Sequence, residues 1–251
     1  MEIRGFISVV PLADKYPGMT PYNYTANNPI KYIDPDGSCY TLNENGEYEP
    51  CADGNAGDQR KGAFGYSWTM TGNDGWQLTN GADPSTVNYE YDYIEPTGNA
   101  DYYTKRYKNH IEKYNTRPPD YYLGYGHKYI NRFKNETKSK MSDLGKKWID
   151  QTAVELQTLM NQGIDIKPSI QGNNKSFMKF AYKTHIPAYT AGELINKLPF
   201  SDLWKIYDTP DFRDKWGSAA GFEQIMGMMG YLFTPKLLKE TDAVIPIMPI
   251  H

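Results

Sequence analysis

Apolar and polar positions follow two different patterns along this chain, and the change falls near residue 100. Residues 38–100 are rich in Gly, Asn, Asp and Thr and hold only short aromatic runs, which predicts short β-strands in long loops. From about residue 102, apolar residues recur three and four positions apart, as amphipathic helices require. The pattern therefore predicts an α+β fold, with a small β-rich N-terminal part followed by a mainly α-helical domain.

Residues 120–136 have the most regular helical pattern. Their spacing places four aromatic side chains and a carboxylate on one face, namely Tyr122, Tyr125, Tyr129, Phe133 and Glu136. Ser142 is expected to cap a second helix that ends at Gly163. Further helices are expected at 175–184, from a capping box at 190–193 through Leu198, after Ser201, and at 218–233.

The two parts carry opposite charge. Residues 38–100 hold 10 Asp/Glu against 2 Lys/Arg, whereas residues 101–148 hold 12 Lys/Arg against 5 Asp/Glu. This split fits two solvated faces of opposite sign, or a basic surface for an anionic substrate that the acidic segment covers. The sequence has no apolar run long enough for a membrane span and no conventional N-terminal signal peptide.

The two cysteines of the chain, Cys39 and Cys51, flank an Asn-Gly turn signal at Asn45-Gly46. Cysteines on facing strands of a hairpin can reach disulfide geometry, and a protein outside the cytosol can keep such a bridge. The alternative is a pair of reduced thiols. A zinc site is not expected, because no paired His lies nearby.

The N-terminal stretch holds a dense set of specific positions. These are Pro11-Leu12-Ala13-Asp14-Lys15-Tyr16-Pro17, then Asn27-Asn28-Pro29, and finally Asp34-Pro35-Asp36-Gly37. Residues 4–37 thereby resemble the C-terminal end of the RHS/YD-repeat core, whose secreted β-shells usually end in N-x-P-x-x-x-x-D-P-x-G before a variable toxin domain. Val10 and Ser38 depart from the family pattern, which has Asp and, in self-cleaving members, Leu at these places.

The resemblance and the change of pattern near residue 100 together predict three parts: an RHS-core-like tail at 1–37, an acidic β/loop-rich segment at 38–100, and a mainly helical domain at 101–251, which the resemblance makes the effector (toxin) domain. The resemblance also implies secretion or delivery to a target cell by a specialised route. The implied partners are a cognate immunity protein and an RHS shell, in cis or in trans.

Chemistry within residues 38–251 must be sought in single residues, because GxSxG, HExxH and Walker motifs are missing, and neither a metal nor a cofactor is expected. His185 ends the helix at 175–184, where it is placed as an acid/base or as a cap on the last carbonyls. Glu136 ends the aromatic face, where it suits a general acid or a surface ion pair with Arg132. We expect Glu136 and His185 to face one cleft.

Tyrosines separated by glycines at 121–129 offer either a stacking floor for sugars or bases, or core packing against the helix at 142–162. The candidate substrate-binding residues are Tyr122, Tyr125, His127, Tyr129, Arg132 and Tyr189. The leading hypothesis is an RHS-type toxin effector that hydrolyses glycan or peptidoglycan with a Glu136–His185 pair. The alternatives are a non-enzymatic carbohydrate-binding module, a nuclease toxin that uses the basic segment, and an inactive remnant of a displaced toxin.

Overall fold

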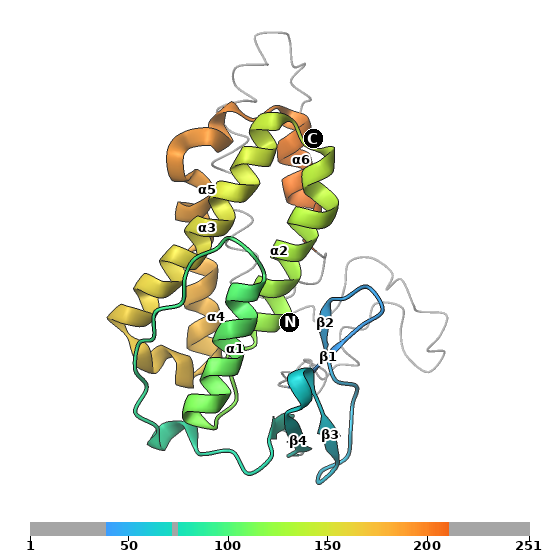
Figure 1. Cartoon of the computed structure of the whole chain (residues 1–251), viewed down its shortest axis with the longest axis vertical. Coiled ribbons are helices and arrows are strands. Elements are labelled where there is room, and N and C mark those ends of the chain that lie inside the picture. Colours follow the sequence, from blue (N-terminus) through green and yellow to red (C-terminus); the bar gives the residue numbers. More distant parts are fainter. Residues whose placement is uncertain (1–38, 72–74, 211–251) are drawn as a thin grey trace, which may run out of the picture.

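The computed structural model describes residues 39–71 and 75–210 of the 251-residue chain. In these residues two small antiparallel sheets precede a mainly helical part (Figure 1), which confirms the α+β class that the sequence predicts. The expectations for the RHS-like tail at 1–37 and for a helix at 218–233 concern residues outside these ranges.

The first sheet is a hairpin of β1 (Tyr40–Leu42) and β2 (Tyr48–Pro50). Asn43 shapes its turn, because the side-chain oxygen accepts hydrogen bonds from two backbone N–H groups of the turn, at 3.0 and 2.9 Å. Gly46 supplies the positive φ of +76° that most residues avoid. The pairing leaves Cys39 and Cys51 opposite each other with Cα atoms 5.2 Å apart, and they form a disulfide.

The second sheet consists of β3 (Gln59–Lys61), β4 (Ser67–Met70) and β5 (Trp76–Leu78), all antiparallel. Alternate residues of β4 and β5 are buried, namely Trp68, Met70, Trp76 and Leu78. This period of two is the pattern of a sheet with one covered face. The two tryptophans therefore anchor the sheet to the rest of the molecule.

The helical part starts with α1 (Asp101–Tyr114). After a loop, one long helical stretch follows, made of η6 (Tyr122–His127), α2 (Lys128–Arg132), η7 (Phe133–Thr137) and η8 (Lys138–Lys140). The longest helix, α3 (Asp143–Ile166), follows. The remaining elements are η9 (Pro168–Gly172), α4 (Asn174–Lys183), α5 (His185–Thr190), η10 (Ala191–Lys197) and α6 (Phe200–Asp208). Short 3-10 turns η3 (Ala63–Gly65) and η5 (Pro84–Thr86) lie in the β-rich part.

Two glycines inside η6 permit close helix and strand contacts. A Cβ on Gly126 would lie 2.6 Å from the ring of Tyr103 on α1, and a Cβ on Gly124 would lie 2.8 Å from the Tyr40 hydroxyl on β1. Both distances are too short for any larger residue unless the neighbours move. The helical cost of these glycines, about 1 kcal/mol each, is thus offset by tight packing of η6 against both α1 and β1.

One hydrophobic cluster joins the β-rich part to the helices. It includes Trp68 and Trp76 from the sheet, Tyr103 from α1, Tyr122 from η6 and Phe177 from α4. A second cluster packs α3 against α5, η10 and α6, around Trp148, Tyr189 and Leu203. The two parts that the sequence separates by pattern therefore share buried surface.

Several predicted helix limits are confirmed and others are wrong. Ser142 caps α3 as expected, since its hydroxyl accepts from the Gly145 N–H at 3.1 Å. The helix does not stop at Gly163, however. That glycine lies inside α3 where a Cβ would meet the Phe180 ring at 2.1 Å, so its role is close packing and not termination.

The predicted capping box at 190–193 is also wrong. The Thr190 hydroxyl donates back to the carbonyl oxygens of Ile186 and Pro187, at 3.0 and 3.3 Å, and so does not cap the next turn. Gly192 and Glu193 have positive φ values of 67° and 58°, which break the chain into the 3-10 turns of η10. The capping motif alone did not reveal this kink.

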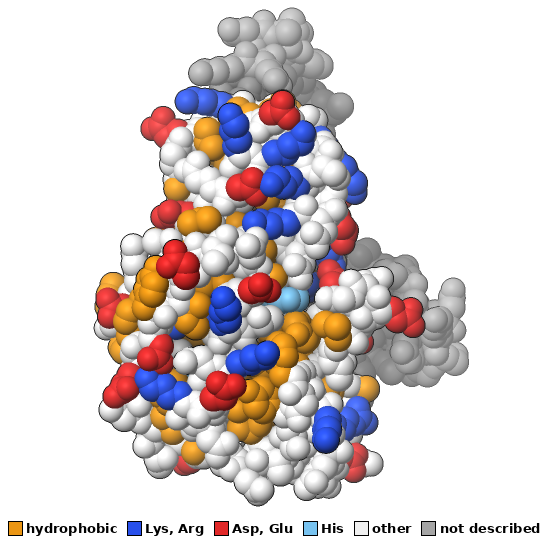
Figure 2. Space-filling view, in the orientation of Figure 1, with side chains coloured by type: hydrophobic (Ala, Val, Ile, Leu, Met, Phe, Trp, Pro, Cys, Tyr) orange, Lys and Arg blue, Asp and Glu red, His pale blue; other side chains and the backbone are white. Residues whose placement is uncertain are grey.

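Acidic side chains of the β-rich part pair with basic side chains of the helices. Glu47 on the hairpin binds Arg132 on α2 at 3.0 Å, and Glu90 and Asp92 bind Lys113 on α1 at 3.1 and 2.9 Å. On the face in Figure 2, basic and acidic side chains lie side by side over the helical part. The opposite charges of the two parts thus form ion pairs between the hairpin, segment 90–92 and the helices. None of the helices within the described residues is both long and apolar enough to cross a bilayer.

Candidate functional site

All four tyrosines proposed to bind substrate are packed in the core. Tyr122, Tyr125 and Tyr129 follow the inner face of η6 and α2, and Tyr189 lies on α5; all four are buried. Tyr122 packs edge-on against Phe177 at 5.1 Å between ring centroids, and Tyr125 packs edge-on against Tyr129 at 4.6 Å. These rings contact one another, so the core-packing interpretation explains them better than a floor for sugars.

His185 lies at the start of α5, with 1% of its surface exposed. Its Nδ1 donates to the carbonyl oxygens of Ala181 and Tyr182, at 3.0 and 3.2 Å, which leaves Nε2 as an acceptor 3.4 Å from the Tyr121 hydroxyl. Burial lowers the pKa of His185 to about 4, so the imidazole is neutral at pH 7. The capping role that the sequence also allowed accounts for these contacts.

Glu136 lies on η7 with its side chain exposed. Its predicted partner Arg132 instead binds both carboxylate oxygens of Glu47, at 3.0 and 3.1 Å. The cavity that His185 lines together with Tyr125 and Tyr129 has no contribution from Glu136. These positions do not support the expectation that Glu136 and His185 share one cleft.

That cavity, called here the His185 cavity, is narrow. It measures about 40 Å³ and lies between η6, α2, α3 and α5, with Tyr103, Tyr121 and Trp148 in its walls. An apolar cavity that takes up benzene measures about 150 Å³. The His185 cavity is therefore too small for a sugar ring unless its walls move.

The remaining predicted binding residues connect the hairpin to the helices. His127 is buried, and its ring packs edge-on against Tyr48 of β2 at 4.7 Å. Burial also lowers the pKa of His127. Arg132 joins Glu47 to the backbone oxygen of Thr209. His127 and Arg132 thus hold β1–β2 against the helical part.

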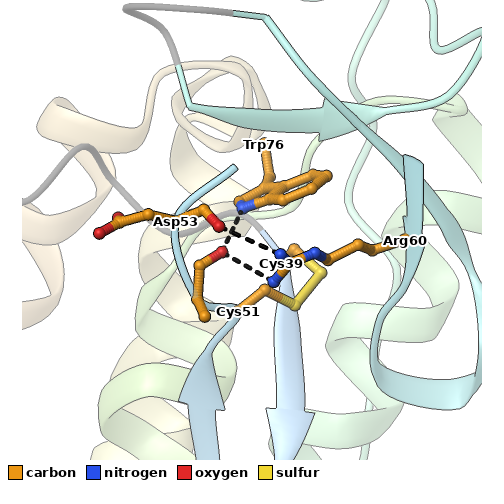
Figure 3. The surroundings of a disulfide bond; sticks show 6 residues. Cys39, Cys51, Asp53, Arg60 and Trp76 are labelled. Carbon is orange, nitrogen blue, oxygen red and sulfur yellow. Dashed lines mark hydrogen bonds between the residues drawn. A yellow bond between two sulfur atoms is a disulfide. The ribbon is translucent and has the colours of Figure 1, made fainter. Parts of the chain in front are cut away.

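The disulfide secures the same hairpin at its other end (Figure 3). The Cys51 N–H donates to the Cys39 oxygen. The segment just after Cys51 is held by Trp76 Nε1 and Arg60, which both donate to the Ala52 oxygen, at 3.3 and 3.0 Å. The Arg60 guanidinium also lies over the Trp76 ring, 5.1 Å from its centroid. The bridge is therefore part of a packed junction between the two sheets.

A second, larger hollow lies between the extended segment 91–96 and α3, where the sequence suggested only a strand and a core helix. The extended segment 91–96 runs beside α3 before the chain enters α1 (Figure 1). Between them is a groove of about 390 Å³, lined from the segment by Tyr91, Tyr93, Glu95 and Pro96 and from α3 by Val154, Thr158, Asn161, Gln162 and Asp165. We call it the Tyr93 groove.

Local geometry explains which side chains reach this groove. Every second residue of an extended segment points the same way, which groups Tyr91, Tyr93 and Glu95. On α3, residues 154, 158, 161 and 165 are three or four apart and share one helix face. The alternation at 87–93 was visible in the sequence, but its partner face on α3 lies more than 60 residues away along the chain.

Buried polar side chains hold the segment in place. Asn161 Nδ2 donates to the Ile94 oxygen at 2.8 Å, and Arg106 Nη1 donates to the Asp92 oxygen at 2.7 Å. Arg106 also donates to the Tyr102 hydroxyl and to Asn161 Oδ1. Burial raises the pKa of Tyr102 to about 12, so its hydroxyl stays protonated and donates to Asn161 Oδ1 at 2.7 Å.

Arg106 is only 2% exposed, and within residues 39–71 and 75–210 it forms no ion pair with a carboxylate. Burying a cation among neutral acceptors is costly unless its donors are satisfied. Here the guanidinium donates to the Asp92 backbone oxygen, which has no strand partner. Burying Arg106 therefore fixes the path of segment 91–96 along α3.

The described part of the chain contains no cluster of three or more His, Cys, Asp or Glu side chains arranged to hold a metal ion. Comparison of the chain with protein-family models, with curated proteins and with solved structures gives no match.

Proposed function

We propose that this chain is the effector region of an RHS-type polymorphic toxin that acts on a glycan in an oxidising compartment outside the cytosol. The resemblance of residues 4–37 to the end of an RHS core supports the carrier context. Cys39 follows that stretch almost directly. The observation that carries the proposal is the Cys39–Cys51 disulfide, because such bridges persist in oxidising compartments and are rare in the cytosol.

The proposal does not assign catalysis to Glu136 and His185. A neutral histidine enclosed by aromatic rings and an exposed glutamate outside its cavity lack the shared access that acid–base catalysis needs. The glycan is favoured as a target class by the exposed ring, carboxylates and carboxamides of the Tyr93 groove. Nucleic acid is less favoured, since many basic side chains of the helical part already pair with acidic ones.

Expression of the full chain in a bacterium, with and without an export leader, tests this function. We expect growth arrest and altered cell shape only when the chain is exported. A Cys39→Ser/Cys51→Ser double variant should lose most of that effect, whereas Leu42→Ser, at an exposed position on the same hairpin, should keep it. Equal growth in both compartments, or toxicity confined to the cytosol, would overturn the proposal.

A further inference from the structure

We infer that the Tyr93 groove is a binding site for a neutral oligosaccharide. This inference deepens the proposed function, on which it rests for its biological setting, by naming the target class and the place where the target binds.

Tyr93 provides the flat apolar surface. Its side chain is 64% exposed, whereas most tyrosines of the described helices are buried against other rings. The hydroxyl donates to Glu95 Oε2 at 2.8 Å, which restrains the ring at the rim of the groove. An exposed, restrained aromatic ring next to a hollow is suited to the apolar C–H face of a sugar.

Hydrogen-bonding groups surround that ring on both sides. Carboxylates accept only, whereas a carboxamide both donates and accepts, and a hydroxyl does the same. Glu95 and Asp165 supply carboxylates and Gln162 supplies a carboxamide, while the Thr158 hydroxyl donates to the Val154 oxygen at 3.0 Å and so is left to accept from a ligand. Together they match the many hydroxyl groups of a sugar, each of which can donate and accept.

The charge of the lining argues against anionic ligands. Glu95 and Asp165 line the groove, and among the described residues that line it there is neither Lys nor Arg. Phosphate or nucleic acid would meet two carboxylates there without a cation at the surface. A cationic peptide is the remaining competitor, and the oligolysine measurement below tests it, whereas the ring and the carboxamide favour a neutral chain.

The groove is rigid before any ligand arrives. Asn161 holds the Ile94 oxygen and Arg106 holds the Asp92 oxygen, so the backbone on either side of Tyr93 is fixed. Farther along, Gln157 accepts from the Gly98 N–H and donates to the Asn99 oxygen, both at 2.8 Å. A preformed site loses less conformational entropy on binding, which favours even weak ligands.

Titration calorimetry of the full chain with chito-oligosaccharides and cello-oligosaccharides tests the inference, with oligolysine as the cationic competitor. We expect at least one of the oligosaccharides to bind, with little dependence on salt. Tyr93→Ala should weaken binding about tenfold, since stacking on the ring is lost. Tyr93→Phe keeps the ring and should change affinity about twofold or less.

Ile166→Ala is the matched control, because Ile166 is 84% exposed beside Asp165 and does not line the groove. Its affinity should equal that of the parent chain. Three results would overturn the inference: no oligosaccharide binding, binding that Tyr93→Ala leaves unchanged, or salt-dependent oligolysine binding in its place. Oligosaccharide binding without toxicity on export would refute the proposed function alone. Toxicity that persists in Tyr93→Ala, together with unchanged oligosaccharide affinity in that variant, would refute the binding site in the Tyr93 groove alone.

Discussion

The His185 cavity and the Tyr93 groove use the same residue type for opposite purposes. In the cavity, the rings of Tyr121, Tyr125 and Tyr189 all contact the neutral His185, and Tyr121 also stacks on Tyr125. In the groove, Tyr93 has most of its side chain exposed to solvent. The comparison teaches that a tyrosine-rich stretch can build either a core or an exposed surface, and that only the contacts of each ring tell the two apart.

The largest expected effect separates the two regions by stability. Tyr121→Ala removes a fully buried ring from the His185 cavity and should lower the free energy of unfolding by about 3–5 kcal/mol. Tyr93→Ala should leave the denaturation midpoint unchanged, because the ring contributes little to the core. Urea denaturation followed by fluorescence measures both. If the two variants were equally destabilised, the comparison would fail.

The pH dependence of stability sharpens the picture of the cavity. Burial holds the pKa of His185 near 4, below the unfolded value of about 6.5, so the unfolded chain binds the proton more readily between these values. The free energy of unfolding is therefore highest above about pH 6.5 and falls as the pH drops towards 4, by up to about 3 kcal/mol from this histidine.

His185→Gln should remove this share of the pH dependence. Tyr121, Tyr125, Tyr182 and Tyr189 contact the imidazole with their rings and stay neutral across this range, so they do not mask the effect. Denaturation midpoints of parent and variant, measured from pH 4 to pH 7, give the difference. A variant with the same slope as the parent would show that His185 titrates normally in the fold.

A smaller effect tests how the groove is supported from inside. Arg106→Lys keeps the charge but loses the planar set of donors that reaches the Asp92 oxygen, the Tyr102 hydroxyl and Asn161. We expect a loss of about 1–3 kcal/mol in unfolding free energy, together with weaker oligosaccharide binding. Hydrogen exchange at residues 91–96 should rise in the variant. Unchanged exchange there would mean that Arg106 does not hold the segment.

Local patterns predicted the elements of this fold well where one strong signal acted alone. The Asn-Gly turn predicted the β1–β2 hairpin, Ser142 predicted the start of α3, and periods of three and four predicted the helices. The same rules failed at Gly163 and at the 190–193 box. There, packing of Phe180 against α3 and the kink at Gly192 and Glu193 decide the outcome.

The candidate sites were less predictable, because a helical pattern states which residues share a face but not what covers that face. The sequence placed Glu136 at the end of the aromatic stripe, yet the buried residue at the end of η7 is Thr137, and Glu136 is exposed. The capping role of His185 was among the alternatives that the sequence offered. The Tyr93 groove was not, since its two walls meet only when Asn161 reaches the Ile94 oxygen across 67 positions of the chain.

By itself, the sequence determined the α+β class, the order of elements, the hairpin that brings Cys39 and Cys51 together, and the opposite charges of the two parts. These properties follow from short-range turn, cap and periodicity effects, which act within a few residues. The tertiary structure alone decided which tyrosine rings of the described residues are buried against other rings, that Tyr93 is exposed, and where segment 91–96 meets α3. Those outcomes depend on contacts between residues far apart in the sequence, such as the hydrogen bond from Asn161 to the Ile94 oxygen, which short-range patterns do not encode.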